Sequence, residues 1–270
     1  MDPLPGGPPV PPIAHLEGLT KVYGDFTAVR DLSLFVEAGE IMALLGPNGA
    51  GKTTTIRMLM GILQPSAGKA FVGGRDCFSE RAEVMGLVGY LPDEPVFYDY
   101  LRGSELLRFV GEMHGLSNAE SLEIAEPLIE RLDLADALDE FAVNYSKGMK
   151  KKLALICAFL HDPPLLILDE PTNGLDPFAT RALHELLLER AERGTAVFFS
   201  THLLDQAEKL CHRVAIVHRG EVAALGRIHE LRDKLAPGGS LEDIFFQVAS
   251  DGPDEEAGNL SASSDDGDVE

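Results

Sequence analysis

A glycine-rich loop has the residue types and spacing that bind phosphate. Residues 46–53 read GPNGAGKT and fit the pattern G-x-x-x-x-G-K-[ST] at every position. Glycines let backbone N–H groups curve around phosphate oxygens, Lys52 adds a mobile cation, and the Thr53 hydroxyl contacts Mg²⁺. We expect the loop to bind the phosphates of a nucleoside triphosphate. The expected contacts are Gly46, Asn48, Gly49, Gly51, Lys52, Thr53 and Thr54.

Two carboxylates follow a second apolar run, PLLILDEP at 164–171. Acidic residues at the carboxyl end of a buried parallel strand face the ligand crevice of an α/β sheet. We therefore predict that Asp169 holds the metal through water and that Glu170 polarises the water that attacks the γ-phosphate. A third apolar run, TAVFF at 195–199, leads to His202, whose imidazole would reach the same phosphate.

The elements that must position these residues can be read from the same stretches. The loop stands between an apolar strand, IMALL at 41–45, and an amphipathic helix. Asp176 and Pro177 are an N-cap and a first helical residue, and the helix that they begin ends at Gly194. Strands that alternate with helices predict an α/β fold with a mainly parallel central sheet.

Composition narrows the class of protein. With a formal net charge of −21 over 270 residues, the chain lacks the excess of Lys and Arg that binds nucleic-acid backbone, so no nucleic-acid partner is expected. The three cysteines form no C-x-x-C pair, which argues against a zinc site or a disulfide framework. The longest apolar run, LALICAFL at 153–160, is far shorter than the roughly 20 residues that span a bilayer.

Both ends differ from the middle in composition. Six of the first twelve residues are proline, and the last twenty include eight acidic residues and no basic one. We expect a disordered proline-rich tail at 1–12, a folded body at 13–250 and a disordered acidic tail at 251–270.

With these motifs in this order, the folded body resembles the ATP-binding cassette (ABC) ATPases almost from end to end. The family's signature segment, usually LSGGQ, has a degenerate counterpart in YSKGM at 145–149. The resemblance implies a P-loop NTPase fold with an antiparallel β subdomain and an inserted helical subdomain at about 94–163. It also implies ATP and Mg²⁺ as ligands, and two cassettes that each complete the other's ATP site with a signature helix.

Further site residues are carried over from the family one at a time. Tyr23 matches the aromatic residue that stacks on adenine, and His202 matches a switch histidine. Ser146 and Gly148 match the phosphate-binding part of the signature, and Asp176 matches an acid that contacts the opposite subunit.

Asp93 is the clearest departure, because the family has a glutamine there that touches Mg²⁺ at the hinge to the helical subdomain. Asp93 would ligate the metal if the loop moved closer; otherwise Glu94 replaces it, or Asp93 is a solvated loop acid. Lys147 stands at a signature glycine and either adds a cation to a partner's ATP or crowds it. We expect the lysines at 150–152 to be solvated or to face the acidic surface of the other subunit.

The resemblance implies the ATP-hydrolysing subunit of an ABC transporter, peripheral at the cytoplasmic face of the membrane. It would form a homodimer, or a heterodimer with a second ABC ATPase, and drive an integral membrane permease. The aromatic residues of EPVFYDYL at 94–101 either contact that permease or tuck under the next helix. The C-terminal stretches at 218–235 and 240–249 resemble those of cassettes that serve bacterial multidrug, antibiotic or polysaccharide-type exporters, which favours export.

Two alternatives belong to other classes: a soluble ABC-type ATPase, and a regulatory module that holds ATP without hydrolysing it. The span between loop and signature leaves no room for the long coiled coil of DNA-acting relatives. Glu170 and His202 argue against a module that does not hydrolyse ATP.

Overall fold

The computed structural model describes residues 11–250, so the tails expected at 1–12 and 251–270 lie, apart from residues 11 and 12, outside the described residues. The larger of its two sheets has the strand order β10-β9-β3-β8-β7-β6. All neighbouring pairs are parallel except β10 and β9. The strands are β3 (Ile41–Leu45), β6 (Val88–Leu91), β7 (Leu165–Asp169), β8 (Ala196–Thr201), β9 (Arg213–His218) and β10 (Glu221–Arg227).

The central strands are apolar throughout because both of their faces are covered. Every residue of β3, β7 and β8 is buried. Alternate side chains of β3 enter two different cores: Ile41, Ala43 and Leu45 belong to one, and Met42 and Leu44 belong to the other. The sheet therefore separates two apolar layers and carries its polar residues at the strand ends.

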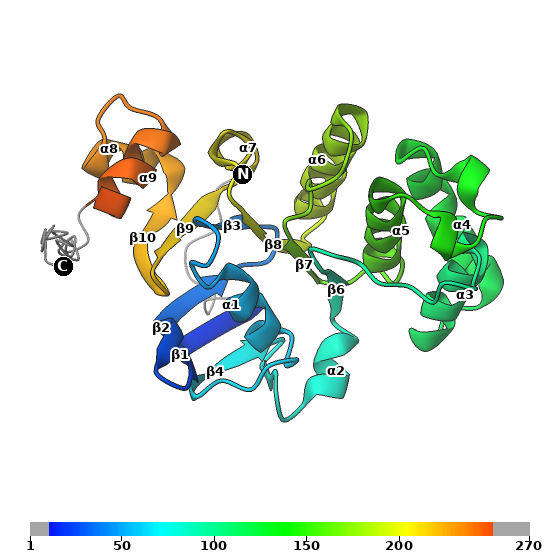
Figure 1. The fold of residues 1–270 in the computed structure, drawn as a ribbon, viewed down its shortest axis with the longest axis horizontal. Coiled ribbons are helices and arrows are strands. Elements are labelled where there is room, and N and C mark those ends of the chain that lie inside the picture. Colours follow the sequence, from blue (N-terminus) through cyan, green and yellow to red (C-terminus); the bar gives the residue numbers. More distant parts are fainter. Residues whose placement is uncertain (1–10, 251–270) are drawn as a thin grey trace, which may run out of the picture.

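The smaller sheet is antiparallel, with the strand order β2-β1-β4-β5. It covers one face of the molecule, below the larger sheet in Figure 1. Its strands are β1 (Ala14–Tyr23), β2 (Phe26–Val36), β4 (Ala67–Val72) and β5 (Arg75–Asp76). The hairpin between β1 and β2 pairs Tyr23 with Phe26 and places both aromatic residues at its tip.

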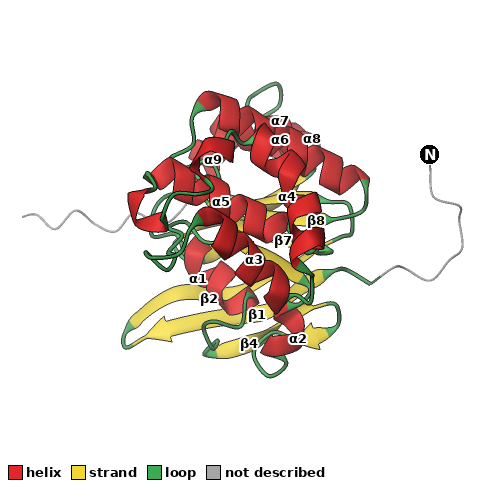
Figure 2. Ribbon diagram, turned by 90° about the vertical axis from the view of Figure 1, so that its right-hand side faces the viewer, coloured by secondary structure: helices red, strands yellow, loops and turns green. Residues whose placement is uncertain are grey.

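Three helices stand together at one end of the molecule (Figures 1 and 2), and Figure 1 shows them away from the antiparallel sheet. They are α3 (Gly103–Met113), α4 (Asn118–Arg131) and α5 (Lys147–Phe159), and all fall within the range 94–163 predicted for a helical subdomain. α4 begins with the reciprocal hydrogen bonds of a capping box, between Ser117 and Glu120. We call these three helices the helical lobe.

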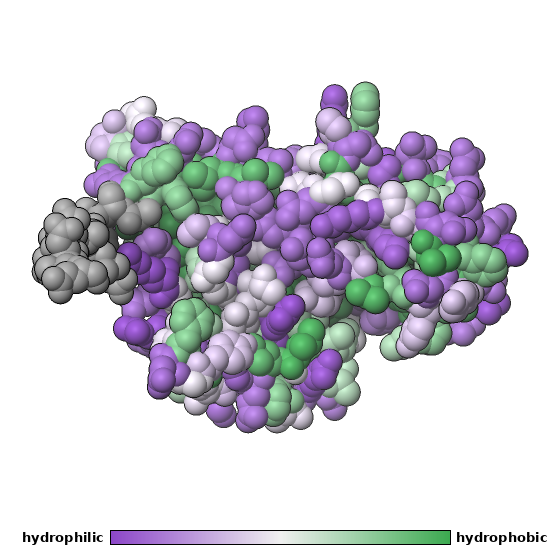
Figure 3. All heavy atoms as spheres, in the orientation of Figure 1, coloured by the Kyte–Doolittle hydropathy of each residue, from purple (hydrophilic) through white to green (hydrophobic). Residues whose placement is uncertain are grey.

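The remaining helices pack against the sheets. α1 (Lys52–Leu59) follows the phosphate loop, and α6 (Pro177–Glu192) begins after Asp176, as the sequence predicts. The others are α2 (Arg81–Met85), α7 (Leu204–Leu210), α8 (Ile228–Leu235) and α9 (Leu241–Ser250). A hydrophilic band crosses the middle of the face drawn in Figure 3, with hydrophobic patches on both sides of it.

Candidate nucleotide-binding site

The phosphate loop joins β3 to α1 and has the backbone that its glycines allow. Gly49 and Gly51 have φ of +81° and +101°, a region that disfavours other residues. A Cβ atom on Gly51 would lie 2.5 Å from the carbonyl oxygen of Ala28, so no larger residue fits. The loop thus has the tight curve that lets backbone N–H groups converge on a phosphate.

Lys52 is buried at the first position of α1, and its side chain turns back over the loop. Its Nζ donates to the carbonyl oxygen of Gly46 at 2.7 Å and lies 3.5 Å from Oε1 of Glu170. A cation held between the loop and an acidic strand end is in place to meet a phosphate that enters between them.

Asp169, the last residue of β7, is buried beside two hydroxyl groups. Ser200 Oγ donates to Asp169 Oδ1 at 2.5 Å and accepts from the backbone N–H of Glu170 at 3.0 Å. Burial raises the pKa of Asp169, while hydrogen bonds from the side chains of Ser200 and Thr53 oppose that rise. The contact of Thr53 with Asp169 brings together a hydroxyl and a carboxylate that suit Mg²⁺, a metal that takes few protein ligands and shares phosphate oxygens and water.

Among residues 11–250, no group of three or more His, Cys, Asp or Glu side chains is arranged to hold a metal ion by itself. The pair of Thr53 and Asp169 therefore fits a metal that enters with its phosphate, and it does not fit a metal caged by protein ligands.

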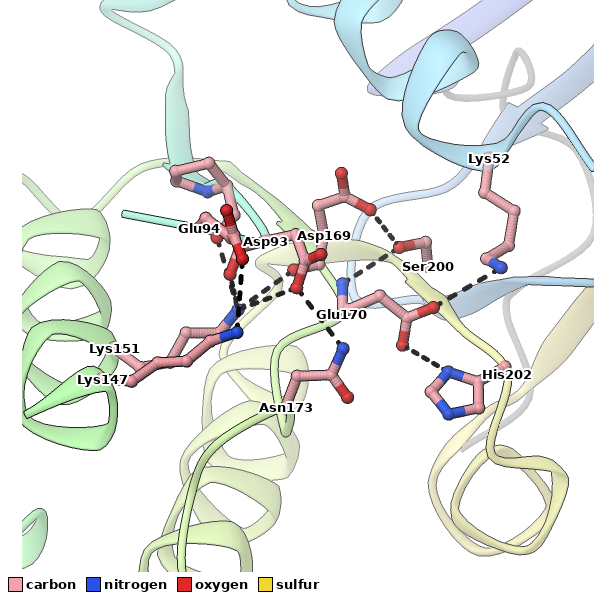
Figure 4. A network of polar contacts seen from close by, with 11 residues as sticks. Lys52, Asp93, Glu94, Lys147, Lys151, Asp169, Glu170, Asn173, Ser200 and His202 are labelled. Atoms are coloured by element: carbon pink, nitrogen blue, oxygen red, sulfur yellow. Dashed lines mark hydrogen bonds and ion pairs between the residues drawn. The ribbon is translucent and has the colours of Figure 1, made fainter. Parts of the chain in front are cut away.

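Glu170 lies just past the strand end, with its carboxylate between a lysine and a histidine (Figure 4). Its Oε2 is 3.0 Å from His202 Nδ1, and its φ of +45° is uncommon for a residue with a side chain. Only 9% of its side chain is exposed. The backbone turn aims the carboxylate into the cleft and away from the core, which is the position that a general base needs.

A single cleft of about 410 Å³ brings most of the predicted residues together. It is lined by the phosphate loop, and also by Asp93, Glu170 and His202. Tyr23 and Phe26, from the tip of the β1–β2 hairpin, form another part of its wall, and 48% of Tyr23 is exposed. An exposed ring beside a phosphate loop is available to stack on a base.

Asp93 follows β6 and lines the same cleft, but its carboxylate already has two neighbours from this chain. Asn173 Nδ2 donates to its Oδ1 at 3.4 Å, and Lys151 Nζ lies 3.8 Å from the same oxygen. The side chain is 43% exposed. Contact of Asp93 with Mg²⁺ remains a prediction.

The signature segment lies outside the residues that line this cleft. Ser146 caps α5, because its Oγ accepts from the backbone N–H of Met149 at 3.2 Å. A Cβ atom on Gly148 would lie 2.8 Å from the carbonyl oxygen of Gly174, so the glycine is required by the packing of this chain. Tyr145 is buried and donates from its hydroxyl to the carbonyl oxygen of Ala137 at 2.6 Å, which anchors the segment to the short 3-10 turn at Ala135–Ala137.

Asp176 is also outside the cleft and forms the N-cap that the sequence predicts. Its Oδ1 accepts from the backbone N–H groups of Phe178 and Ala179, both at 2.9 Å. These hydrogen bonds, together with the nearby Lys152, lower the pKa of Asp176. Its contact with a second subunit remains a prediction.

The expectation that the lysines of this segment are solvated or face another subunit is wrong for Lys151, and Lys152 is less solvated than expected. Lys151 is completely buried, and its Nζ donates to the carbonyl oxygen of Asp93 at 2.8 Å. Lys152 has 12% of its side chain exposed and pairs with Asp176 of its own chain at 3.2 Å. The reason is helical geometry: these residues lie one turn before Leu155 and Ile156, on faces of α5 that pack inward.

A family model described as ABC transporter matches residues 29–173. The chain belongs to the ABC transporter ATP-binding family. A similar relative is the uncharacterized ABC transporter ATP-binding protein YdbJ of Bacillus subtilis, 43% identical over 79% of this chain and 68% of that protein. The linearmycin resistance ATP-binding protein LnrL of the same organism is 35% identical over 88% of this chain and 75% of its own length.

A solved structure of the ATP-binding subunit of an ABC transporter supports the same conclusion. It has a TM-score of 0.83 and 35% identity, and the match covers 87% of this chain and 99% of the other. The P-loop NTPase fold expected from the sequence is therefore confirmed. As a member of this family the cassette is an ATPase subunit of the ABC transporter type.

Three residues of the cassette's polar network were missed from the sequence as parts of the site. Ser200 lies near the end of β8, two residues before His202, and Asn173 follows the acidic end of β7, so their positions near strand ends were a usable signal. Lys151 stands on the apolar stripe of its helix, four residues before Leu155, and this spacing could have shown that it is buried.

Proposed function

We propose that the cassette binds MgATP in the cleft, dimerises across it and hydrolyses ATP with Glu170 as the general base. The proposal rests on the observation that the catalytic motifs and the signature segment lie at two different places on this chain. Lys52, Glu170 and His202 line the cleft, while Ser146 and Gly148 open a helix that does not line it. Each chain therefore carries two different halves of an ATP site: the cleft with the phosphate loop, and the signature segment that begins α5. A second chain would supply the missing half of each site.

The chemistry proposed for this chain's residues follows from their contacts. Lys52 would neutralise phosphate charge, and His202, hydrogen-bonded to Glu170, would orient its carboxylate toward the attacking water. Thr53 and Asp169 would hold Mg²⁺, which offsets the charge that develops on the leaving phosphate. Tyr23 would stack on the adenine.

A Glu170→Gln variant tests the catalytic assignment. The amide keeps the size of the side chain but cannot accept a proton, so kcat should fall by about 100-fold or more. ATP affinity should change little, and an ATP-dependent dimer should accumulate and be visible by sedimentation. Glu37→Gln, outside the cleft, is the matched control. Turnover near that of the wild type would refute the role of Glu170.

We also propose that the partner is an integral membrane permease, which places the cassette peripherally at the cytoplasmic face of the membrane. No helix within residues 11–250 is long and apolar enough to cross a bilayer. Beside the helical lobe, however, Tyr98 and Tyr100 are 68% and 85% exposed, and they border a largely apolar hollow with Phe97, Leu101 and Phe109. Exposed aromatic residues around a hollow are typical of a protein interface.

Export is the direction that we propose for this transporter. The similarity to a linearmycin resistance protein, and to a probable multidrug ABC transporter ATP-binding protein of Escherichia coli, supports it.

Co-purification of the cassette with the permease that it serves, with and without a Tyr98→Ser, Tyr100→Ser change, would test the aromatic surface beside the helical lobe. Equal recovery of the permease with both forms would argue against docking there.

A further inference from the structure

Lys151 is a fully buried ammonium group that the proposed chemistry at the phosphate loop does not use. Its exposed fraction is 0%, although it stands only five residues after Ser146 in α5. Removing a charge from water is costly unless polar partners replace the water. The partners of Lys151 therefore indicate what it does.

Those partners come from two segments that border the nucleotide cleft (Figure 4). Nζ donates to the carbonyl oxygens of Pro92 at 3.3 Å and Asp93 at 2.8 Å, just after β6. It also donates to the carbonyl oxygen of Asp169, at the end of β7, at 3.4 Å. An ammonium group has three donors, so these carbonyls can satisfy all of them. The Asp93 carboxylate, 3.8 Å away, balances its charge.

We propose that Lys151 is a positioning residue that joins the signature helix to Asp93, so that Lys151 and Asp93 act as one charge pair. Asp93 lines the cleft, and Lys151 belongs to α5, the helix that Ser146 caps. A movement of residues 92–93 when the cleft binds nucleotide is then passed to α5 as a whole, because a helix moves as a rigid element. The proposal rests on the proposed function, in which Ser146 meets the ATP of a second chain.

A purely space-filling role does not account for this arrangement. An apolar side chain of similar length would fill the volume without the cost of burying a charge. Burial does lower the pKa of Lys151, and the nearby Asp93 and Asp169 carboxylates oppose that effect. The carboxylate at position 93 and the ammonium at 151 are thus matched, and removing either one alone takes from the other the opposite charge 3.8 Å away.

The test is a double-mutant cycle of Lys151→Gln, Asp93→Gln and both together, each measured for ATPase kcat, ATP affinity and thermal unfolding. Each single change should lower kcat by about tenfold or more, with ATP affinity changed less than about threefold. The double variant has two neutral amides that can hydrogen-bond, and its kcat should return to within about threefold of the wild type. Lys150→Gln, at the partly exposed neighbouring lysine, is the matched control and should change neither quantity.

Two results would overturn the proposal. One is an additive loss in the double variant, which would mean that the residues act separately. The other is an unchanged kcat in Asp93→Gln beside a large fall in Lys151→Gln, which would indicate that Lys151 only supports the fold. If Lys151→Gln alone does not fold, the comparison of Asp93→Gln with the double variant still decides.

The same cycle in the Glu170→Gln background, with the ATP-dependent dimer as the readout, separates this proposal from the proposed function. Absence of any dimer in Glu170→Gln itself counts against the function. The charge pair is supported if Glu170→Gln forms a normal dimer, each single change weakens that dimer, and the double change restores it.

Discussion

The Ser200 hydroxyl holds two neighbouring acidic residues in place, Asp169 through its side chain and Glu170 through its backbone. It donates to Asp169 and accepts from the backbone N–H of Glu170, and it is completely buried. The second hydrogen bond supports the uncommon backbone conformation of Glu170, with its φ of +45°. The direction of the carboxylate proposed as the general base therefore depends on a side chain from the neighbouring strand β8.

A Ser200→Ala variant should lose both activity and stability. The buried N–H of Glu170 would have no partner, at a cost of about 1–3 kcal/mol in the free energy of unfolding. We expect kcat to fall by about tenfold, because the carboxylate loses its alignment, with a smaller change in the KM for ATP. Urea unfolding and steady-state ATPase assays measure the two effects. Ser121→Ala is the control, since the buried hydroxyl of Ser121 has no partner in the described part of the chain. Equal effects of the two changes would contradict the role of Ser200 in positioning Glu170.

Among the elements, the strands and their ends could be predicted from the sequence better than the faces of α5. Buried parallel strands are continuous apolar runs, and the phosphate loop and the N-cap Asp176 have local signals, so each was placed correctly. In α5 the spacing of Lys151 from Leu155 indicates burial, but the groups that its ammonium contacts depend on which segments pack against the helix. The partners of Lys151 are 18 to 59 residues away in the sequence, so no local pattern could identify them.

The contact between α3 and the end of α5 predicts a pH-dependent stability. His114 and His161 stack with ring centroids 3.6 Å apart. Burial, and then the charge of His114, lower the pKa of His161 to about 4, and burial lowers the pKa of His114. Both pKa values are below those of the unfolded chain, so the unfolded state takes up protons first and stability falls as the pH decreases from about 6.5 toward 4.

Replacing His161 with phenylalanine should remove part of this pH dependence while it keeps a stacked ring. From pH 7 to pH 5 the wild type should lose about 1 kcal/mol more than His161→Phe, roughly half of what the full pKa shift implies, because the ring is partly exposed to solvent. Urea unfolding at the two pH values gives the difference. Parallel curves for the two proteins would show that His161 does not carry the effect. His229→Phe, in another part of the structure, serves as the control.

For the whole molecule, the formal net charge of −21 means that dimerisation brings two acidic bodies together. Local cations at the contact must then offset a long-range repulsion. In the proposed dimer Lys147 would be such a cation: 62% of its side chain is exposed, and its Nζ lies 3.3 Å from Oε1 of Glu94. An exposed pair of this kind is worth only about 0–1 kcal/mol, so Lys147 is free to turn toward the phosphate of a second chain's ATP.

Lys147→Gly in the Glu170→Gln background should therefore weaken the ATP-dependent dimer, with a dissociation constant that rises by roughly fivefold to tenfold. Lys147→Ala separates loss of the charge from the lower helix propensity of glycine at this position. Glu94→Gln should act in the opposite direction, because it releases Lys147 from its partner in the same chain. Sedimentation at low and high salt measures all three, and the effect of Lys147 should shrink as salt increases. A tighter dimer in Lys147→Gly and Lys147→Ala would mean that the side chain crowds the partner's phosphate at the point where the family usually has a glycine.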